Sequence, residues 1–332
     1  MTRIAVIGAG AWGTAIANLR AKAGDPVTIW AFEPDVVRDI NERHRNEMFF
    51  PDAPLHQSLR ATENLAEALD GAAVVVSAAP SHAVRKVMTA AAPSLVRGAL
   101  VVSASKGLEM AGLKRITEVL AEVLPAGTGV VALSGPTFAR EVYEDQPTAC
   151  AAAGEQGAAC QAQRAMSAAR FRVYTNDDVI GVELGGALKN VIAIAAGILE
   201  GLGLGNNPRA ALITRGLAEI TRLGVAMGAQ PLTFAGLAGM GDLVLTACGP
   251  LSRNRSLGVA LGQGQALEQI MAGRHSVAEG VGTARAAVEL GARVGVEMPI
   301  ATEVMRVLFE GKPARAAIGD LMDRALKSEA PA

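Results

Sequence analysis

The distribution of hydrophobic residues divides the chain into two parts of different character. In the first part, short uninterrupted apolar runs predict strands at 3–7, 26–30, 74–78, 100–103, 130–133 and 148–152. Helical patterns lie between them, at 11–23, 81–91 and 116–124. Apolar strands separated by helices are typical of a parallel sheet covered on both faces. This part is therefore predicted to be a Rossmann-like, doubly wound α/β domain.

From about Asp177 the pattern becomes one of long helices. Glycine-rich joints at 201–205 and 236–241 separate these helices, and no strand is predicted. A chain of 332 residues exceeds the length at which a single core stops growing. We therefore predict an α/β domain over residues 1–178 and an all-α domain over residues 179–332.

The helix predicted over 179–199 is apolar on nearly every side, yet Lys189 lies in its middle. A buried ammonium group loses solvation, so it needs a partner or a lowered pKa, and a lowered pKa suits a proton donor. The alternative is a lysine whose stem packs along the helix while its charged end reaches solvent. A membrane span is not predicted, because Glu183, Lys189 and Asn190 interrupt the apolar run.

Charge and cysteine content narrow the class of protein. The chain has 31 Lys and Arg against 32 Asp and Glu, a net charge of −1, and no basic block. Neither a nucleic acid nor a membrane surface is therefore expected as a partner. The three cysteines lack the spacing of a metal site or a disulfide framework, so no metal is expected. With no signal-peptide pattern at the start, we expect a cytoplasmic protein.

A glycine fingerprint, Gly8-x-Gly10-x-x-Gly13, follows the first predicted strand and opens the first predicted helix. Such glycines permit a tight turn, close approach to a pyrophosphate and close helix–strand packing, while the helix N-terminus attracts phosphate. We therefore predict a dinucleotide site in residues 1–178. Glu33 lies about 20 residues beyond the fingerprint, as in NAD sites, but Arg38 is one turn further, so NAD and NADP both stay open.

Eight segments together resemble one family. They are GAGAWGTAIA, SASKGLE, LSGPTFAREV, ELGGALKNVIAIAAG, AALITRGLAEI, GLAGMGDLVLT, PLSRNRSLG and AEGVGTA, in this order over nearly the whole chain. This set resembles the NAD(P)-dependent glycerol-3-phosphate dehydrogenases of bacterial type. The resemblance implies interconversion of dihydroxyacetone phosphate and sn-glycerol 3-phosphate for phospholipid synthesis. It also implies an active site between the domains and a homodimer.

The resemblance assigns roles residue by residue. Lys189 would be the catalytic proton donor and acceptor. The phosphorylated substrate would contact Lys106, Gly135, Thr137, Lys189, Asp242, Ser252, Arg253 and Asn254. The cofactor, with NADPH favoured by the resemblance, would contact Gly8, Gly10, Ala11, Trp12, Gly13, Phe32, Lys106, Ala139, Arg253, Val277 and Glu279. Phe32 departs from the family, whose members often carry a basic residue or histidine there.

The chemistry of these residue types agrees with that assignment. Reduction of a ketone needs a proton for the new alkoxide, and an ammonium supplies both the proton and positive charge. A second lysine, Lys106, would lower the pKa of the donor. Asp242 would orient Lys189 or cap the helix that begins near Leu243. Arg253 would bind a phosphate, or else form a solvated pair with Arg255.

Two other functions fit parts of the pattern. A β-hydroxyacid dehydrogenase also joins a Rossmann domain to a helical domain around a lysine, and it would prefer a carboxylate substrate. A redox-sensing module would bind a dinucleotide without turnover. The serine–arginine–asparagine segment and the two lysines argue against the β-hydroxyacid dehydrogenase. The retained Lys189 and Asp242 argue against the redox-sensing module.

Overall fold

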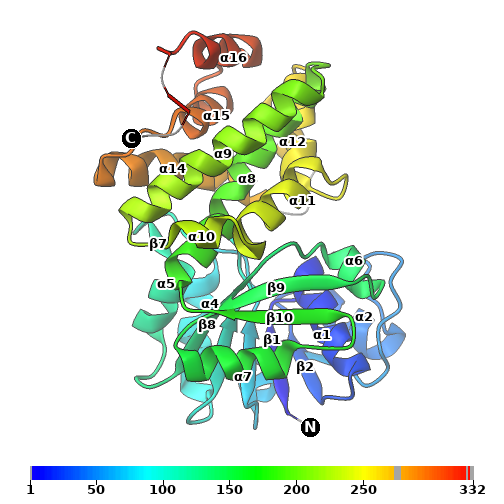
Figure 1. The fold of residues 1–332 in the computed structure, drawn as a ribbon. Coiled ribbons are helices and arrows are strands. Elements are labelled where there is room, and N and C mark those ends of the chain that lie inside the picture. Colours follow the sequence, from blue (N-terminus) through cyan, green and yellow to red (C-terminus); the bar gives the residue numbers. More distant parts are fainter. Residues whose placement is uncertain (1, 273–277, 327, 330–332) are drawn as a thin grey trace.

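The computed structural model describes residues 2–272, 278–326 and 328–329. It has a sheet domain and a helical domain, and the helical domain packs above one end of the sheet (Figure 1). The sheet strands are β1 (Ile4–Ile7), β2 (Val27–Trp30), β3 (Arg60–Thr62), β4 (Val74–Ser77), β5 (Leu100–Ser103), β8 (Gly129–Ser134), β9 (Thr148–Ala153) and β10 (Phe171–Asn176). A small hairpin, β6 (Leu108–Glu109) with β7 (Lys114–Arg115), lies outside this sheet.

The eight strands lie in the order β10-β9-β8-β5-β4-β1-β2-β3. All neighbouring pairs are parallel except β8 and β9, which pair antiparallel with Ala132 opposite Ala153. The prediction of a wholly parallel sheet was therefore wrong at this pair. The strands β3 and β10 were not predicted, because β3 has three residues and β10 alternates buried and exposed side chains at the sheet edge.

Both faces of the sheet are covered by helices, as the apolar strands predict. The helices are α1 (Ala11–Lys22), α2 (Pro34–Arg43), α3 (Leu65–Leu69), α4 (Val84–Ala91) with the 3-10 turn η1 (Ala92–Ser94), α5 (Ile116–Val123), α6 (Ala139–Tyr143) and α7 (Gln156–Met166). In β1, Ile4 and Val6 pack against α1, α2 and α7. Ala5 and Ile7 belong to the opposite core, with α3, α4 and α5. The Rossmann-like fold is thereby confirmed.

The second domain is helical throughout its described residues, as predicted. Its elements are α8 (Val179–Gly201), α9 (Asn206–Ala226), α10 (Pro231–Phe234), the π-helical turn η2 (Leu237–Gly241), α11 (Asp242–Cys248), α12 (Arg253–Gly262), α13 (Leu267–Ala272), α14 (Glu279–Val294), α15 (Pro299–Phe309) and α16 (Ala314–Met322). The long helix α8 is buried along most of its length. Other helices surround it, so it forms the centre of this domain (Figure 1).

The helices α8 and α12 pack at backbone distance. A Cβ placed on Gly197 of α8 would lie 2.0 Å from the carbonyl oxygen of Arg255, and one on Gly258 of α12 would lie 2.0 Å from that of Ile194. Gly201 and Gly262 repeat the same contact one turn further on. This pair of glycine stripes holds α12 against α8, and α12 begins beside the segment predicted to bind substrate.

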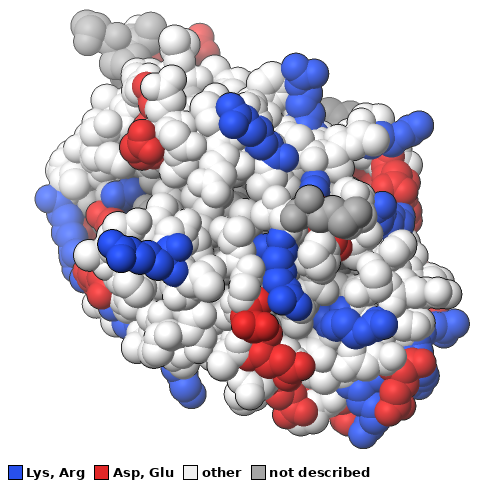
Figure 2. Space-filling view, turned by 90° about the horizontal axis from the view of Figure 1, so that it is seen from below, with Lys and Arg blue, Asp and Glu red and all other residues white. Residues whose placement is uncertain are grey.

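Two segments of the described chain, Val179–Gly201 and Pro231–Cys248, are long and apolar enough to cross a membrane by length and composition. Val179–Gly201 is α8, whose apolar residues are buried inside the helical domain. Pro231–Cys248 contains the η2 turn and the buried carboxylate of Asp242. On the face of the sheet domain in Figure 2, Lys and Arg side chains are interspersed with Asp and Glu.

Candidate active site

The carboxyl ends of the central strands face the helical domain. Loops after β1, β4, β5 and β8 carry Gly8, Ser81, Lys106 and Thr137. In Figure 1 the chain N-terminus lies at the opposite end of the sheet, away from α8 and α10. Ligands of doubly wound sheets bind at the carboxyl ends of the strands, so a ligand-binding site is expected at this end of the sheet.

The glycine fingerprint has the geometry that a dinucleotide requires. Gly8 has φ +114°, and a Cβ there would lie 2.9 Å from backbone atoms of Ala78 and Ala79. A Cβ on Gly13 would lie 1.9 Å from the carbonyl oxygen of Gly8. Gly10 faces open space and precedes α1 without a side-chain cap or an acidic first turn. These residues therefore fit a pyrophosphate against the α1 N-terminus.

Trp12, in the same loop, packs its ring against Phe171 at 6.4 Å between centroids, and its indole Nε1 is buried without a partner in the described structure. Ala11 and Ala139 both pack against the small core of Ala15, Phe50 and Ala53. Phe32, just past β2, is 75% exposed. Val277 lies outside the described residues.

Lys106 follows β5 and reaches three acceptors with its ammonium group. Its Nζ donates to the carbonyl oxygen of Gly135 at 2.8 Å, to Thr137 Oγ1 at 3.0 Å and to Asp242 Oδ2 at 2.9 Å. Gly135 and Thr137 come from the loop after β8, whereas Asp242 begins α11. One lysine thus joins the sheet domain to the helical domain.

Lys189 is buried, and its Nζ donates to the other carboxylate oxygen of Asp242 and to Thr246 Oγ1 at 2.8 Å. The interpretation of Lys189 as a lysine that extends into solvent is therefore wrong, because its side chain is only 6% exposed. Asp242, with 1% of its side chain exposed, bridges Lys106 and Lys189.

The environment of Lys189 favours loss of its proton. Burial lowers its pKa to about 7, and although the carboxylate of Asp242 opposes this change, the nearby Lys106 adds to it. A pKa near neutrality is the property of a group that both gives and takes a proton at physiological pH.

Local sequence explains how these groups meet. A Cβ on Gly186 of α8 would lie 2.4 Å from Ser134 Oγ at the end of β8, so the glycine lets α8 lie close to the end of this strand without displacing the Ser134 hydroxyl. The π-helical turn η2 directly precedes Asp242, and such turns frequently mark functional sites. Gly241, not Asp242, is the N-cap of α11, so the carboxylate contacts the lysines instead of capping the helix.

The residues at the start of α12 differ in burial and in their partners. Ser252 Oγ caps the helix by accepting from the Arg255 amide at 3.2 Å. The buried Asn254 donates to Asn190 Oδ1 at 2.9 Å and accepts from the Gly280 amide at 3.0 Å. Arg253 is exposed. Arg255 instead pairs with Glu200, both Nη2–O distances being 2.6 Å, so the two arginines do not form a solvated pair.

Glu279 at the start of α14 also reaches the sheet domain. Its carboxylate accepts from the Ser81 amide at 3.2 Å and from Ser81 Oγ at 2.5 Å. Glu279 is thus placed at the end of β4, next to the loop that carries Lys106, where a bound cofactor would lie in this fold.

Several residues of this site were missed in the sequence. Thr246 lies one helical turn after Asp242, and Asn190 directly follows Lys189, so their spacing held a usable signal. Ser81 and Glu183 carried no such signal, because each finds its partner in the other domain. Glu183 of α8 accepts from Arg115 and Thr117 near the start of α5.

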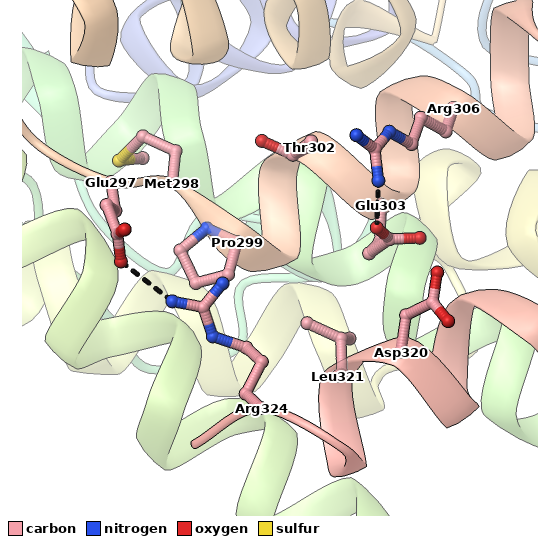
Figure 3. Close-up of a pocket in the computed structure, with 9 residues that line it drawn as sticks. All are labelled: Glu297, Met298, Pro299, Thr302, Glu303, Arg306, Asp320, Leu321 and Arg324. Atoms are coloured by element: carbon pink, nitrogen blue, oxygen red, sulfur yellow. Dashed lines mark hydrogen bonds and ion pairs between the residues drawn. The ribbon is translucent and has the colours of Figure 1, made fainter. Parts of the chain in front are cut away.

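A separate pocket of about 270 Å³ lies between α15 and α16 (Figure 3). Its charged side chains pair with one another, Arg324 with Glu297 at 2.7 Å and Arg306 with Glu303 at 2.8 Å. The helix N-terminus that forms part of its wall is already capped, since buried Glu219 accepts from the amides of Ile300 and Ala301. None of the residues predicted for the site lines this pocket.

Comparison with known proteins identifies the family. Residues 3–160 match the family model "NAD-dependent glycerol-3-phosphate dehydrogenase N-terminus", and residues 178–319 match the corresponding C-terminus model. The chain is 54% identical over 330 residues to a glycerol-3-phosphate dehydrogenase [NAD(P)+] of Geobacter sp. (strain M21), covering 98% of both chains. It is 55% identical to that of Geobacter metallireducens, again over 98% of both.

The crystal structure of a glycerol-3-phosphate dehydrogenase from Coxiella burnetii is also similar. It superposes with a TM-score of 0.93 at 37% identity, covering 97% of this chain and 99% of that one. The two family-model matches extend over both domains and include the fingerprint, Lys106, Lys189 and Asp242. The chain belongs to the NAD-dependent glycerol-3-phosphate dehydrogenase family.

Proposed function

We propose that this protein catalyses the NAD(P)-dependent interconversion of dihydroxyacetone phosphate and sn-glycerol 3-phosphate. The observation that carries the proposal is the pair of ion pairs by which Asp242 joins Lys106 to Lys189. They lie at the carboxyl ends of the central strands, as the glycine fingerprint does. Family membership favours this substrate over the carboxylate of a β-hydroxyacid.

Lys189 is the proposed proton donor to the carbonyl oxygen. When bound, the nicotinamide supplies the hydride for the carbonyl carbon. The ammonium of Lys189, held by Asp242 and Thr246, stabilises the developing alkoxide and then protonates it. In the reverse direction the neutral amine takes the proton from the alcohol.

Lys106 is the proposed second cation of the active site. Because it is anchored to Gly135, Thr137 and Asp242, its charge stays fixed beside Lys189. A fixed charge costs no reorganisation as the oxygen becomes negative.

The start of α12 is the proposed place for the substrate phosphate. Arg253 would supply the guanidinium, whose fork matches phosphate oxygens, and the helix N-terminus would add backbone N–H groups. Asn254, whose side chain is engaged by Asn190 and Gly280, would fix the backbone of this turn.

We further propose a cytoplasmic homodimer whose product serves phospholipid synthesis, with domains at 1–178 and 179–332. Free thiols at Cys150, Cys160 and Cys248 support a reducing compartment. The end of β10 at Asn176 and the start of α8 at Val179 support the domain division. Light scattering of the purified protein would measure the mass of the assembly, and a monomeric mass would contradict the dimer.

The decisive experiment measures cofactor oxidation with dihydroxyacetone phosphate and compares the protein with Lys189→Ala. Loss of the proton donor is expected to lower kcat by about 10²- to 10⁴-fold. Cofactor binding should change little. The variant should fold, because Asp242 keeps Lys106 as its partner.

Lys114→Ala, at an exposed surface ion pair, is the control and should retain full activity. If Lys189→Ala turns over at the normal rate, the proposed role of Lys189 is wrong. If the protein reduces β-keto acids in preference to dihydroxyacetone phosphate, the proposed substrate is wrong.

A further inference from the structure

We infer that the adenosine end of the cofactor site selects NADH over NADPH, with Glu33 as the specificity-determining residue. This inference rests on the proposed function, because it places the dinucleotide on the glycine fingerprint. It goes beyond that function by choosing between two cofactors that the family's name leaves open.

The end of β2 lies directly beside the fingerprint. The Gly8 amide donates to the carbonyl oxygen of Trp30 at 3.0 Å, and the Ala31 amide donates to that of Thr62 at 3.1 Å. The turn after β2 therefore lies between the fingerprint and the end of β3. Phe32 and Glu33 carry the first side chains beyond Ala31, at the position where this fold reads the adenosine ribose.

The carboxylate of Glu33 is available to a ligand. Glu33 is the N-cap of α2, but its side chain makes no capping hydrogen bond, and its backbone is extended. It is partly exposed. A carboxylate here accepts hydrogen bonds from the ribose hydroxyls of NADH, whereas the 2′-phosphate of NADPH would bring a like charge against it.

No unpaired cation in the described part of this turn compensates for that repulsion. Arg38 of α2 donates from Nη2 to Asp35 Oδ1 at 2.6 Å. Phe32 is uncharged and 75% exposed. Glu63 directly follows the neighbouring strand β3, and Glu67 lies in the first turn of α3, where it accepts from Thr62 Oγ1 at 2.6 Å. The edge that would meet a 2′-phosphate is therefore acidic.

The experiment titrates the purified protein with NADH and with NADPH, without substrate, and follows cofactor fluorescence. NADH should bind about tenfold more tightly or better, since juxtaposed like charges cost that much or more. Glu33→Arg should reverse the preference, because the guanidinium pairs with a 2′-phosphate. Glu33→Gln should bring the two dissociation constants closer together. It weakens the hydrogen bonds to the ribose of NADH and removes the repulsion of the 2′-phosphate of NADPH.

Glu42→Arg makes the same charge change at an exposed position near the other end of α2, and it should leave the ratio unchanged. Equal or tighter binding of NADPH by the unmodified protein overturns the inference, as does a Glu33→Arg variant with an unaltered ratio. Binding of neither nucleotide overturns the inference together with the proposed function. Tight NADH binding without reduction of dihydroxyacetone phosphate supports the inference and contradicts the proposed function alone.

Discussion

At the scale of single residues, the chemistry of this protein depends on the burial of one amine. In water Lys189 would stay protonated well above neutral pH, but burial lowers its pKa to about 7. The carboxylate of Asp242 stabilises the protonated form of Lys189, and the hydrogen bond to Thr246 fixes the direction of Nζ. The amine is thus held in place and can still exchange its proton.

This pKa predicts opposite pH profiles for the two directions of the reaction. Reduction of the ketone needs the ammonium, so kcat should fall as the pH rises through about 7. Oxidation of glycerol 3-phosphate needs the neutral amine, so its kcat should rise over the same range. Initial rates at saturating substrate between pH 5 and pH 9 test this, and parallel profiles in the two directions would contradict it.

Lys106 should control the position of that profile. Its positive charge lowers the pKa of Lys189, so Lys106→Gln should move the midpoint to higher pH, in addition to slowing the reaction. The midpoint is the informative measurement, because a variant that was merely misfolded would lose rate without moving it. An unmoved midpoint would show that the two charges do not interact.

At the scale of elements, the glycine stripes of α8 and α12 set the position of the α12 N-terminus. The two helix backbones touch at Gly197 and Gly258, which leaves no room for a methyl group. Ordinary helices keep their axes 8–10 Å apart, with side chains between them. The closer approach lets Asn254 at the start of α12 reach Asn190, the residue after Lys189.

Gly258→Ala should therefore destabilise the fold, although alanine favours helices. Its Cβ would lie 2.0 Å from the Ile194 carbonyl oxygen, a backbone atom that cannot turn away. We expect a loss of about 1–3 kcal/mol in the free energy of unfolding, measured in urea. Gly319→Ala in α16 is the matched control, because no atom lies within 4 Å of its Cβ. It should stabilise by about 0.5–1 kcal/mol.

At the scale of the whole molecule, polar contacts join the two domains on several sides of the site. Lys106 of the sheet domain pairs with Asp242, and Ser81 donates to Glu279. On the remaining side, Glu183 of α8 accepts from the Arg115 guanidinium at 2.8 Å and the Thr117 amide at 2.8 Å. These contacts fix α8, and with it Lys189, relative to the sheet.

Removal of the Glu183 contact should loosen this arrangement. Glu183→Ala leaves the largely buried guanidinium of Arg115 without that carboxylate, and it keeps Thr117 Oγ1 and the exposed Glu118 as partners. The expected loss in unfolding free energy is about 2–4 kcal/mol by urea denaturation. Glu289→Ala, at an exposed position of α14, should change it by less than about 0.5 kcal/mol. Equal stability of the two variants would exclude a structural role for Glu183.

The sequence alone determined the features that depend on neighbours along the chain. The apolar runs located the central strands, because a strand buried on both faces has no polar positions. The fingerprint predicted its own turn, because the φ of Gly8 and the packing of Gly13 are local requirements. The position of Lys189 in an apolar helix likewise predicted that this lysine needs a partner.

Only the tertiary structure decided which partner that is. Asp242 lies 53 residues from Lys189 and 136 from Lys106, and no periodicity links positions so far apart. The antiparallel pairing of β8 with β9 and the partners of Glu183 and Glu279 could not be predicted from the sequence either. The pKa of Lys189 belongs to this second group. It depends on how completely the folded chain removes water from the amine and on which charges it brings close.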